Sequence, residues 1–195
     1  MSVESPVFPP LEYWDDHEDI IKIPMSLAEY LRLPEKPKSE WVRGVTLIMP
    51  PARFLHAAIH GRLIALLYGS LTDCIVLPNA GLRMPGIRRV PDIMVVKDLP
   101  ADSEEVWIDN PPLLAVEIIS PATHRNDEIF KRAEYLEKGV QQYWLVDRYL
   151  RKITVLVNLG TNWGQEIIID DKHPQADIAV GTHGIVQLDL NKILG

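Results

Sequence analysis

Apolar residues follow two different spacings along the chain, and these spacings predict both helices and strands. Between Phe54 and about Leu71, apolar side chains recur every three or four residues, as in a helix with one buried face. Residues 75–84, 90–96 and 113–120 form short apolar runs, and the last two are nearly continuous, which is typical of strands covered on both faces. The pattern predicts an α/β fold of the mixed α+β type.

Shorter signals predict the elements near the beginning of the chain. Ser26 and Glu29 have the spacing of a capping box, which would open a helix over residues 26–33. The apolar segments WVRGV and TLIMP meet next to Gly44 and are expected to pair as strands. This region should therefore contribute one short helix and a pair of strands.

The second half of the chain predicts one more long helix and further strands. A helix is expected over residues 127–138, ending at Gly139, a residue suited to a left-handed C-terminal cap. Its inward apolar stripe would consist of Ile129, Ala133 and Leu136. Residues 141–147 and 152–157 are expected to form a hairpin, with shorter β segments over 164–195.

The chain is expected to consist of one domain preceded by an arm. Residues 1–24 are rich in proline and acidic residues and lack periodicity, which predicts an extended arm anchored by Tyr13 and Trp14. The remaining length suits one hydrophobic core. We therefore expect residues 25–195 to form a single domain.

Composition and charge narrow the class of protein. The chain is 47% hydrophobic, without an apolar run near the roughly 20 residues of a membrane span, so a cytoplasmic protein without membrane contact is expected. The lone Cys74 cannot form an internal disulfide. The net charge of −7 argues against tight nonspecific nucleic-acid binding. It does not exclude a nuclease, because acidic residues around a metal site contribute to the same total.

Two carboxylates interrupt the apolar strands. Asp92 and Glu117 lie where burial is expected, and buried carboxylates need compensation. If the two strands are neighbours, these carboxylates converge and repel each other unless a proton or cation lies between them. Mg²⁺ or Mn²⁺, which favour oxygen ligands, would meet this need. The alternatives are that Asp92 caps a turn and that Glu117 pairs with a buried cation such as Arg89.

A polar stripe accompanies the apolar one on the predicted helix 127–138. Asp127, Lys131 and Tyr135 are spaced by four residues and so lie on one face. Lys131 could reach inward toward the carboxylates. It could equally form an exposed salt bridge with Asp127 or Glu134 on the helix surface.

The pattern of Pro91-Asp92 followed by Glu117-x-Ile119 resembles the Pro-Asp…(Asp/Glu)-x-Lys nuclease superfamily. In that superfamily a lysine stands where this chain has Ile119, and it helps to orient or activate the attacking water. A protein with this spacing must relocate the positive charge or lose the chemistry. Lys131 is the candidate for the relocated charge.

Longer motifs extend the resemblance to one family. The segments SLAEYL, MPPARFLH, VPDIMVV, VEIISPATHRND and GVQQYWLVD together resemble the Uma2 family of restriction-endonuclease-like proteins, found mainly in bacteria and abundant in cyanobacteria. The resemblance covers roughly residues 25–160. It implies a restriction-endonuclease-like fold, with a central mixed sheet flanked by helices.

The resemblance also implies roles for particular residues. Asp92 and Glu117 would be metal ligands, Glu40 the third acid and Lys131 the displaced lysine. The family usually has an acidic residue where Arg43 stands in this sequence, and often another where Val45 stands.

Other polar residues are given smaller roles. His56 and His60 are four residues apart on the helix, but a zinc site would need further ligands. His56 matches a histidine of the family and is expected near the site or the substrate, as are Asp127 and Tyr135. Asp147 is expected to end its strand at a turn.

Three hypotheses of function follow. The leading one is Mg²⁺- or Mn²⁺-dependent hydrolysis of nucleic acid, DNA above all, with Asp92, Glu117, Glu40 and the backbone carbonyl of Ile118 holding the metal. The second is a catalytically weak or inactive relative that serves binding or assembly, as Ile119 and the acidic net charge suggest. The third is a regulatory protein that forms a homodimer through its N-terminal arm and its apolar hairpin.

Overall fold

The computed structural model describes residues 20–102, 104–121, 123–164 and 166–195, and in these residues the chain forms two six-stranded sheets and a two-stranded one. Tyr13, Trp14 and most of the expected arm lie outside the described residues. The end of that arm, Ile21–Pro24, is a strand that pairs with Val45–Ile48. Within the described part of the chain, no helix is long and apolar enough to span a membrane.

The central sheet is mixed, as expected. Its strands, from one edge to the other, are β12 (Ile167–Ile169), β11 (Lys152–Val157), β10 (Gln142–Asp147), β9 (Leu114–Ile119), β7 (Ile93–Val96) and β4 (Ile75–Pro78). Strands β9 and β10 are parallel, and the other neighbours are antiparallel. A parallel pair needs a crossover, and the helical segment between β9 and β10 supplies it.

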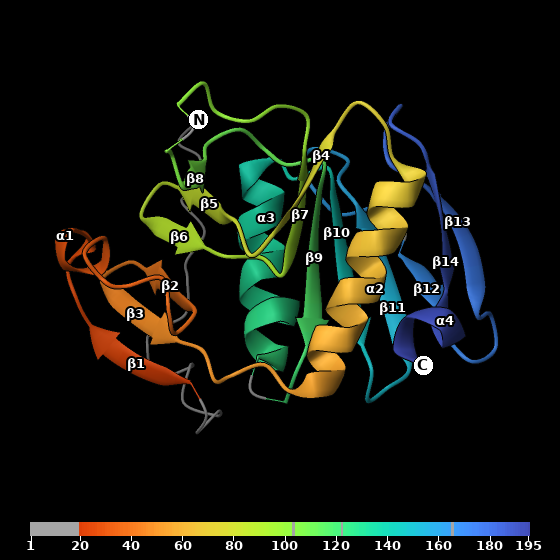
Figure 1. The fold of residues 1–195 in the computed structure, drawn as a ribbon, viewed down its shortest axis with the longest axis horizontal. Coiled ribbons are helices and arrows are strands. Elements are labelled where there is room, and N and C mark those ends of the chain that lie inside the picture. The colour runs from red at the N-terminus through yellow and green to blue at the C-terminus, as the bar shows by residue number, and fades with distance from the viewer. Residues whose placement is uncertain (1–19, 103, 122, 165) are drawn as a thin grey trace.

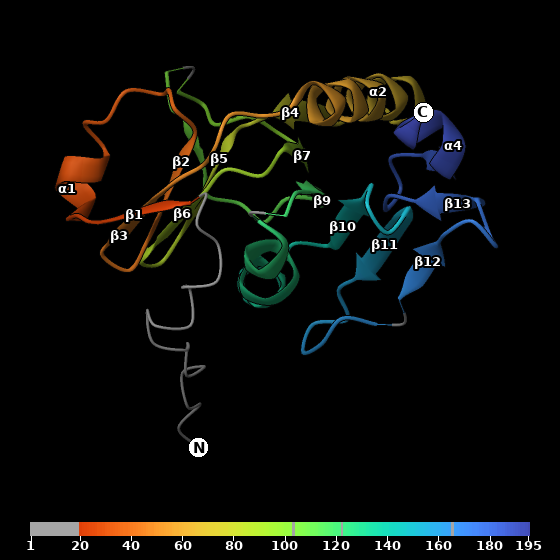
Figure 2. The same cartoon turned by 90° about the horizontal axis from the view of Figure 1, so that it is seen from below.

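The second sheet lies beside the central one (Figure 2). Its strands, in order, are β1 (Ile21–Pro24), β3 (Val45–Ile48), β2 (Ser39–Val42), β6 (Ile87–Arg89), β5 (Gly81–Met84) and β8 (Trp107–Ile108). The expected pairing of WVRGV with TLIMP is confirmed as the β2–β3 hairpin. Arg43 and Gly44, which connect these strands, both have positive φ, the backbone conformation of a tight hairpin turn.

The pattern of the apolar run 75–84 predicted one strand, and this prediction was wrong. It divides into β4 in the central sheet and β5 in the second sheet. Asn79, with φ of 49°, turns the chain between them, and asparagine tolerates this left-handed conformation better than most residues. The chain therefore crosses from one sheet to the other at a point that hydrophobicity alone does not mark.

Two helical segments cover opposite faces of the central sheet (Figures 1 and 2). One is α2 (Phe54–Ser70); the other begins as a π-helical turn, η2 (Asn126–Lys131), and continues as α3 (Arg132–Lys138), which ends at Gly139 with φ of 84°. Both helices were predicted, and Gly139 is the expected left-handed cap.

The remaining elements lie at the two ends of the molecule. The capping box at Ser26 is confirmed, but its helix, α1 (Leu27–Tyr30), is shorter than the predicted 26–33. Strands β13 (Gln175–Ala179) and β14 (Ile185–Asp189) confirm the β segments expected near the end of the chain. They are followed by α4 (Leu190–Leu194), a helix that the pattern did not predict and that contacts α2.

Helix α2 packs as its periodicity predicts. Ile59, Leu63 and Leu67 are fully buried and belong to one core cluster with Val116 and Ile118 of β9. Leu55 lies at the exposed beginning of the helix. Burial of this apolar stripe is the hydrophobic contribution that holds α2 on the sheet.

The other helical segment packs with the opposite face from the one predicted. Ile129 and Ala133 are exposed, whereas Asp127, Lys131 and Tyr135 are buried. The predicted apolar stripe was therefore wrong. The physical reason is that the polar side chains find charged partners on the sheet, so that burying them costs less than the pattern suggests.

Candidate active site

Strands β7 and β9 bring Asp92 and Glu117 to the same place. The strands are antiparallel with Ile93 opposite Val116, so Asp92, directly before β7, lies near Glu117 and Ile118. The Ile118 amide donates a hydrogen bond of 2.9 Å to Asp92 Oδ2. Asp92 and Glu117 are 6% and 2% exposed, as expected for carboxylates within apolar strands.

Lys131 reaches inward and joins three carboxylates. Its Nζ lies 2.9 Å from Glu117 Oε1, 3.1 Å from Glu40 Oε1 and 3.1 Å from Asp127 Oδ1. Of the two arrangements proposed for Lys131, the structure shows the inward one. The contact with Asp127 on the same helix also exists, but it is buried and not on the exposed helix surface. The Tyr135 hydroxyl donates to Glu117 Oε1 at 3.0 Å, so the residues of the polar stripe meet one strand carboxylate.

Glu40, on β2, is fixed by the neighbouring strand as well as by Lys131. Its Oε1 accepts a 3.0 Å hydrogen bond from the Val90 amide, and its Oε2 accepts one of 2.7 Å from Arg89. Arg89 also donates to both oxygens of Glu134. The alternative in which Arg89 compensates Glu117 is therefore wrong: Lys131 and Tyr135 contact Glu117, whereas Arg89 joins Glu40 to Glu134.

Three side chains surround Asp92 from outside the helix of Lys131. Lys38 Nζ lies 2.7 Å from Asp92 Oδ1, and His56 Nε2 lies 3.6 Å from Asp92 Oδ2. His60 Nε2 lies 2.8 Å from the Asp92 backbone carbonyl. Lys38 was missed in the sequence, although its spacing of two residues from Glu40 places both side chains on one face of an extended segment.

Negative charges outnumber positive ones in this cluster. Among the described side chains that contact one another here, five carboxylates face three cations: Glu40, Asp92, Glu117, Asp127 and Glu134 against Lys38, Arg89 and Lys131. An excess of two negative charges remains. Such an excess must be met by protons or by further cations.

The pKa values divide the carboxylates of the cluster into two groups. Burial raises the pKa of Glu117, and the nearby charges of Asp127 and Asp92 act in the same direction, so it reaches about 8 despite Lys131. Burial also raises the pKa of Asp127, and there too Lys131 opposes the effect. These two carboxyls therefore hold protons more readily than ordinary ones.

Glu40 and Asp92 behave in the opposite way. Burial alone would raise their pKa values, but Lys131 and Arg89 beside Glu40, and Lys38 and His56 beside Asp92, lower both to about 2. Burial disfavours the charged form of Lys131, yet its carboxylate partners raise its pKa well above the usual range. Lys131, Glu40 and Asp92 are thus charged at neutral pH.

A large cleft opens onto this cluster. It has a volume of about 1180 Å³, and its lining includes Asp92, Glu117 and Lys131. The basic side chains of Lys36, Lys38, Arg53 and Arg148 also line it. Although the protein is acidic as a whole, the cleft therefore presents cations beside the carboxylates.

The side chains of the cluster suit a divalent metal ion by chemistry and charge. They offer carboxylate oxygens, the ligands that Mg²⁺ and Mn²⁺ prefer, and their excess of two negative charges matches one such ion. In the conformation shown by the described residues, no three His, Cys, Asp or Glu side chains are placed to hold a metal. The Lys131 ammonium lies among three of the carboxylates instead.

Comparison with known proteins gives a consistent result. The model of the Uma2 family, described as "Putative restriction endonuclease", matches residues 27–190. A similar solved structure is that of "a putative nuclease belonging to DUF820 from Anabaena variabilis ATCC 29413", with a TM-score of 0.72 and 21% identity over 88% of this chain and 98% of that one. No curated protein matches the chain. The likeness to the solved structure confirms the expected nuclease-like fold.

Proposed function

The chain belongs to the Uma2 family of restriction-endonuclease-like proteins, and on this premise we propose that it is a metal-dependent nuclease that hydrolyses phosphodiester bonds, with DNA as its substrate. The observation that carries the proposal is the carboxylate cluster around Lys131, with its two excess negative charges, on the wall of the 1180 Å³ cleft. Apolar residues can often replace a buried ion network at little cost in stability. A network of buried carboxylates in a cleft is therefore a candidate for a functional site.

The metal-binding part of the proposed site consists of Asp92, Glu117 and the backbone carbonyl of Ile118. A bound Mg²⁺ or Mn²⁺ would supply a Lewis acid for the phosphate and a water of lowered pKa. Asp92 is held for this role by the Ile118 amide, and Glu117 by Tyr135. Glu40 was expected as a third ligand, but it is fully buried and, unlike Asp92 and Glu117, does not line the cleft, which favours a role in anchoring Lys131 and Arg89.

Lys131 provides the positive charge that the Ile119 position does not. It stays protonated, so it orients a water or contacts a phosphate oxygen as a hydrogen-bond donor and does not act as a base. Asp127 and Glu40 keep its ammonium group next to Glu117. A phosphate in the cleft would also meet Lys38, whose side chain is partly exposed beside Asp92.

The test is cleavage of supercoiled and single-stranded DNA with Mg²⁺ or Mn²⁺. Asp92→Asn and Glu117→Gln keep the shape of each side chain and remove its charge, and both should abolish metal-dependent cutting. Glu35→Gln is the matched control, because Glu35 is an exposed carboxylate lining the same cleft. Cutting that survives in Asp92→Asn and Glu117→Gln, or that needs no metal, would contradict the proposal.

One observation favours a second function, a nuclease-fold protein that binds without cutting. Lys131 bridges three carboxylates, so the cluster can also serve as a buried ion network that fixes the fold. This function predicts binding of DNA without turnover under every metal condition. The same cleavage assay, combined with a binding measurement, separates the two.

The homodimer expected from the sequence stays a prediction. The mass of the protein in solution, with and without residues 1–19, tests it directly. A strict monomer in both forms would contradict it.

A further inference from the structure

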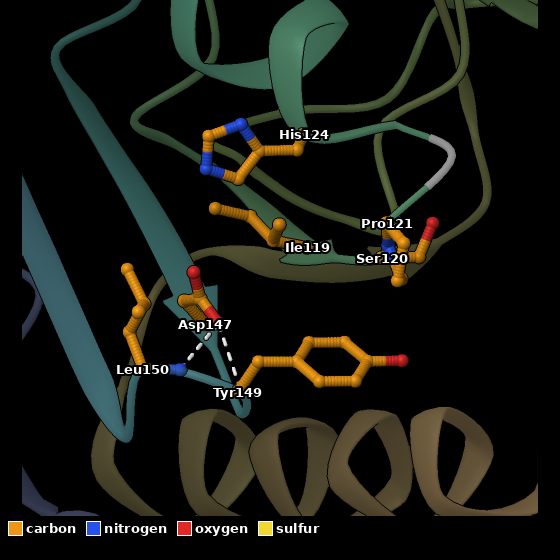
Figure 3. Close-up of a pocket in the computed structure, with 7 residues that line it drawn as sticks. All are labelled: Ile119, Ser120, Pro121, His124, Asp147, Tyr149 and Leu150. Atoms are coloured by element: carbon orange, nitrogen blue, oxygen red, sulfur yellow. Dashed lines mark hydrogen bonds between the residues drawn. The ribbon is translucent and has the colours of Figure 1, made fainter. Parts of the chain in front are cut away.

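A second, smaller pocket lies at the end of strands β9 and β10 (Figure 3). It has a volume of about 300 Å³, and it shares Ile119, Ser120, Pro121 and Tyr149 with the lining of the large cleft. It is therefore a side pocket of that cleft. A ligand lying in the cleft along the carboxylate cluster could extend one of its groups into this pocket.

The chemistry of the pocket comes from one buried carboxylate between apolar walls. Asp147 is 2% exposed, and its Oδ1 accepts hydrogen bonds from the backbone amides of Tyr149 at 2.8 Å and Leu150 at 2.9 Å. These two bonds fix the orientation of the carboxylate. Ile119, Pro121 and Leu150 supply apolar surface around it.

The second oxygen of Asp147 is left for a ligand. Among the hydrogen bonds of the described residues, none reaches Asp147 Oδ2. In Figure 3 this oxygen points away from the turn, toward the side of the pocket where His124 lies. A carboxylate oxygen is an acceptor only, so the group that it would bind must carry an N–H or O–H donor.

An aromatic side chain borders the same pocket. The Tyr149 ring extends along it from the turn, and 48% of the residue is exposed. The guanidinium group of Arg148 lies 4.1 Å from the ring centroid, which restrains the ring and places a positive charge beside it. A flat ligand can stack on such a ring, and a phosphate next to that ligand would meet Arg148.

The pocket also lies close to the proposed site of cleavage. Asp147 is the register partner of Ile119, two residues beyond Glu117 on β9, and paired residues of neighbouring strands point to the same face. Two residues along a strand correspond to roughly 7 Å, and the step to the neighbouring strand adds roughly 5 Å sideways. A group bound at Asp147 is therefore about one nucleotide away from a phosphate at Glu117.

From these contacts we propose that this pocket binds a nucleobase that carries an exocyclic amino group, with cytosine as the type case. The amino group donates to Asp147 Oδ2, and the base stacks on Tyr149. Aspartate accepting from the cytosine N4 amino group is an established form of base recognition. The inference rests on the proposed function insofar as it takes nucleic acid as the ligand, but it does not require cleavage.

The test measures binding of two oligonucleotides whose bases differ in the exocyclic group on C4 and in the proton on N3. Fluorescently labelled octamers of deoxycytidine and of deoxyuridine are titrated with the full-length protein in EDTA, which prevents metal-dependent cutting. The wild type should bind the deoxycytidine octamer more tightly, on the order of tenfold, because uracil presents an oxygen where cytosine presents the amino group.

Asp147→Asn is the variant that tests the recognition of the base most directly. The turn still requires an acceptor, so the asparagine oxygen replaces Oδ1 and its NH₂ group takes the place of Oδ2. This donor suits uracil O4, and the preference should invert in favour of the deoxyuridine octamer. Asp177→Asn, which removes one exposed carboxylate from β13, is the matched control and should leave the preference unchanged.

Tyr149→Ala should weaken binding of both octamers by about tenfold without changing their ratio, and Tyr149→Phe should restore it. Equal affinities of the wild type for the two octamers, or an unchanged ratio in a folded Asp147→Asn protein, would overturn the pocket and leave the nuclease proposal standing. A clear preference without any cleavage activity would support the pocket and contradict the nuclease. Absence of binding to both octamers would overturn the pocket, whereas the nuclease proposal is decided by the cleavage assay with Mg²⁺ or Mn²⁺.

Discussion

The two faces of the central sheet are covered by helices of opposite character. On one face, α2 presents Ile59, Leu63 and Leu67, each fully buried among apolar strand residues. On the other face, the η2–α3 segment presents Asp127 and Lys131, which are almost as deeply buried but ionisable. Nearly the same depth of burial is thus reached by two different interactions.

A local sequence pattern reveals the packing of α2 but not that of the η2–α3 segment. An apolar stripe is stable against almost any apolar surface, because the hydrophobic effect is not directional. A buried ammonium group is tolerated only where carboxylates surround it at hydrogen-bonding distance. The α2 face therefore needs no particular partner, whereas the face of η2–α3 needs Glu40 and Glu117 within hydrogen-bonding distance of Lys131, where β2 and β9 place them.

Removing the central charge should have the largest effect. Lys131→Met leaves Glu40, Glu117 and Asp127 without their shared cation, and the free energy of unfolding should fall by about 3–5 kcal/mol. Urea unfolding in EDTA measures it. Lys172→Met, on the surface, is the control and should change stability by less than about 0.5 kcal/mol. An equal midpoint for Lys131→Met and the wild type would show that the charged face does not depend on this lysine.

The effect of added Mg²⁺ on the stability of Lys131→Met tests whether the carboxylates bind a metal ion. If the carboxylates bind the ion, Mg²⁺ should stabilise Lys131→Met more than the wild type, because the ion then takes over the charge compensation. A stability of Lys131→Met that does not respond to Mg²⁺ or Mn²⁺ would argue against the metal site.

On the apolar face, Leu63→Ala should lower the free energy of unfolding by about 3 kcal/mol, through lost burial and the cavity that remains. Leu55→Ala, on the same helix but 41% exposed, should cost clearly less. Urea unfolding monitored by circular dichroism gives both values. In contrast to Lys131→Met, the stability of Leu63→Ala should be insensitive to divalent ions beyond the response of the wild type.

The pH dependence of stability should come from the charged face. Glu117 has a pKa of about 8 in the folded protein and an ordinary value of 4.5, so the folded state holds a proton that the unfolded state releases in this range. The free energy of unfolding in EDTA should therefore fall as pH rises from about 4.5 to 8. Glu117→Gln should flatten this decline, and a parallel decline in both proteins would contradict the assignment.

The smallest effect is expected for Tyr135→Phe. The substitution removes only the hydroxyl that donates to Glu117 Oε1, and the ring keeps its place against Tyr143. A loss of about 1 kcal/mol of stability is expected, because Lys131 still contacts the same oxygen. Chemical unfolding measures the loss, and a value as large as that of Lys131→Met would mean that the hydroxyl, and not the ammonium, holds Glu117.

Local sequence motifs predicted much of the fold and part of the candidate site. The capping box at Ser26, the hairpin turn at Gly44 and the stop at Gly139 depend on a few neighbouring residues, so they can be recognised without tertiary structure. Asp92 and Glu117 stood out because a charge within an apolar strand violates the pattern around it. The division of residues 75–84 between two sheets carries no such signal, since both halves are equally apolar.

From the amino-acid sequence we could predict the two long helical segments and most strands, the family, and the carboxylates that interrupt the core strands. The contacts of Lys131 with Glu40, Glu117 and Asp127, the contact of Lys38 with Asp92, and the place of Asp147 in a pocket of the cleft became visible only in the folded chain. The physical reason is that secondary structure follows from backbone and hydrophobic preferences over a few residues. The stability of a buried charge depends instead on partners that strand pairing brings from distant parts of the chain.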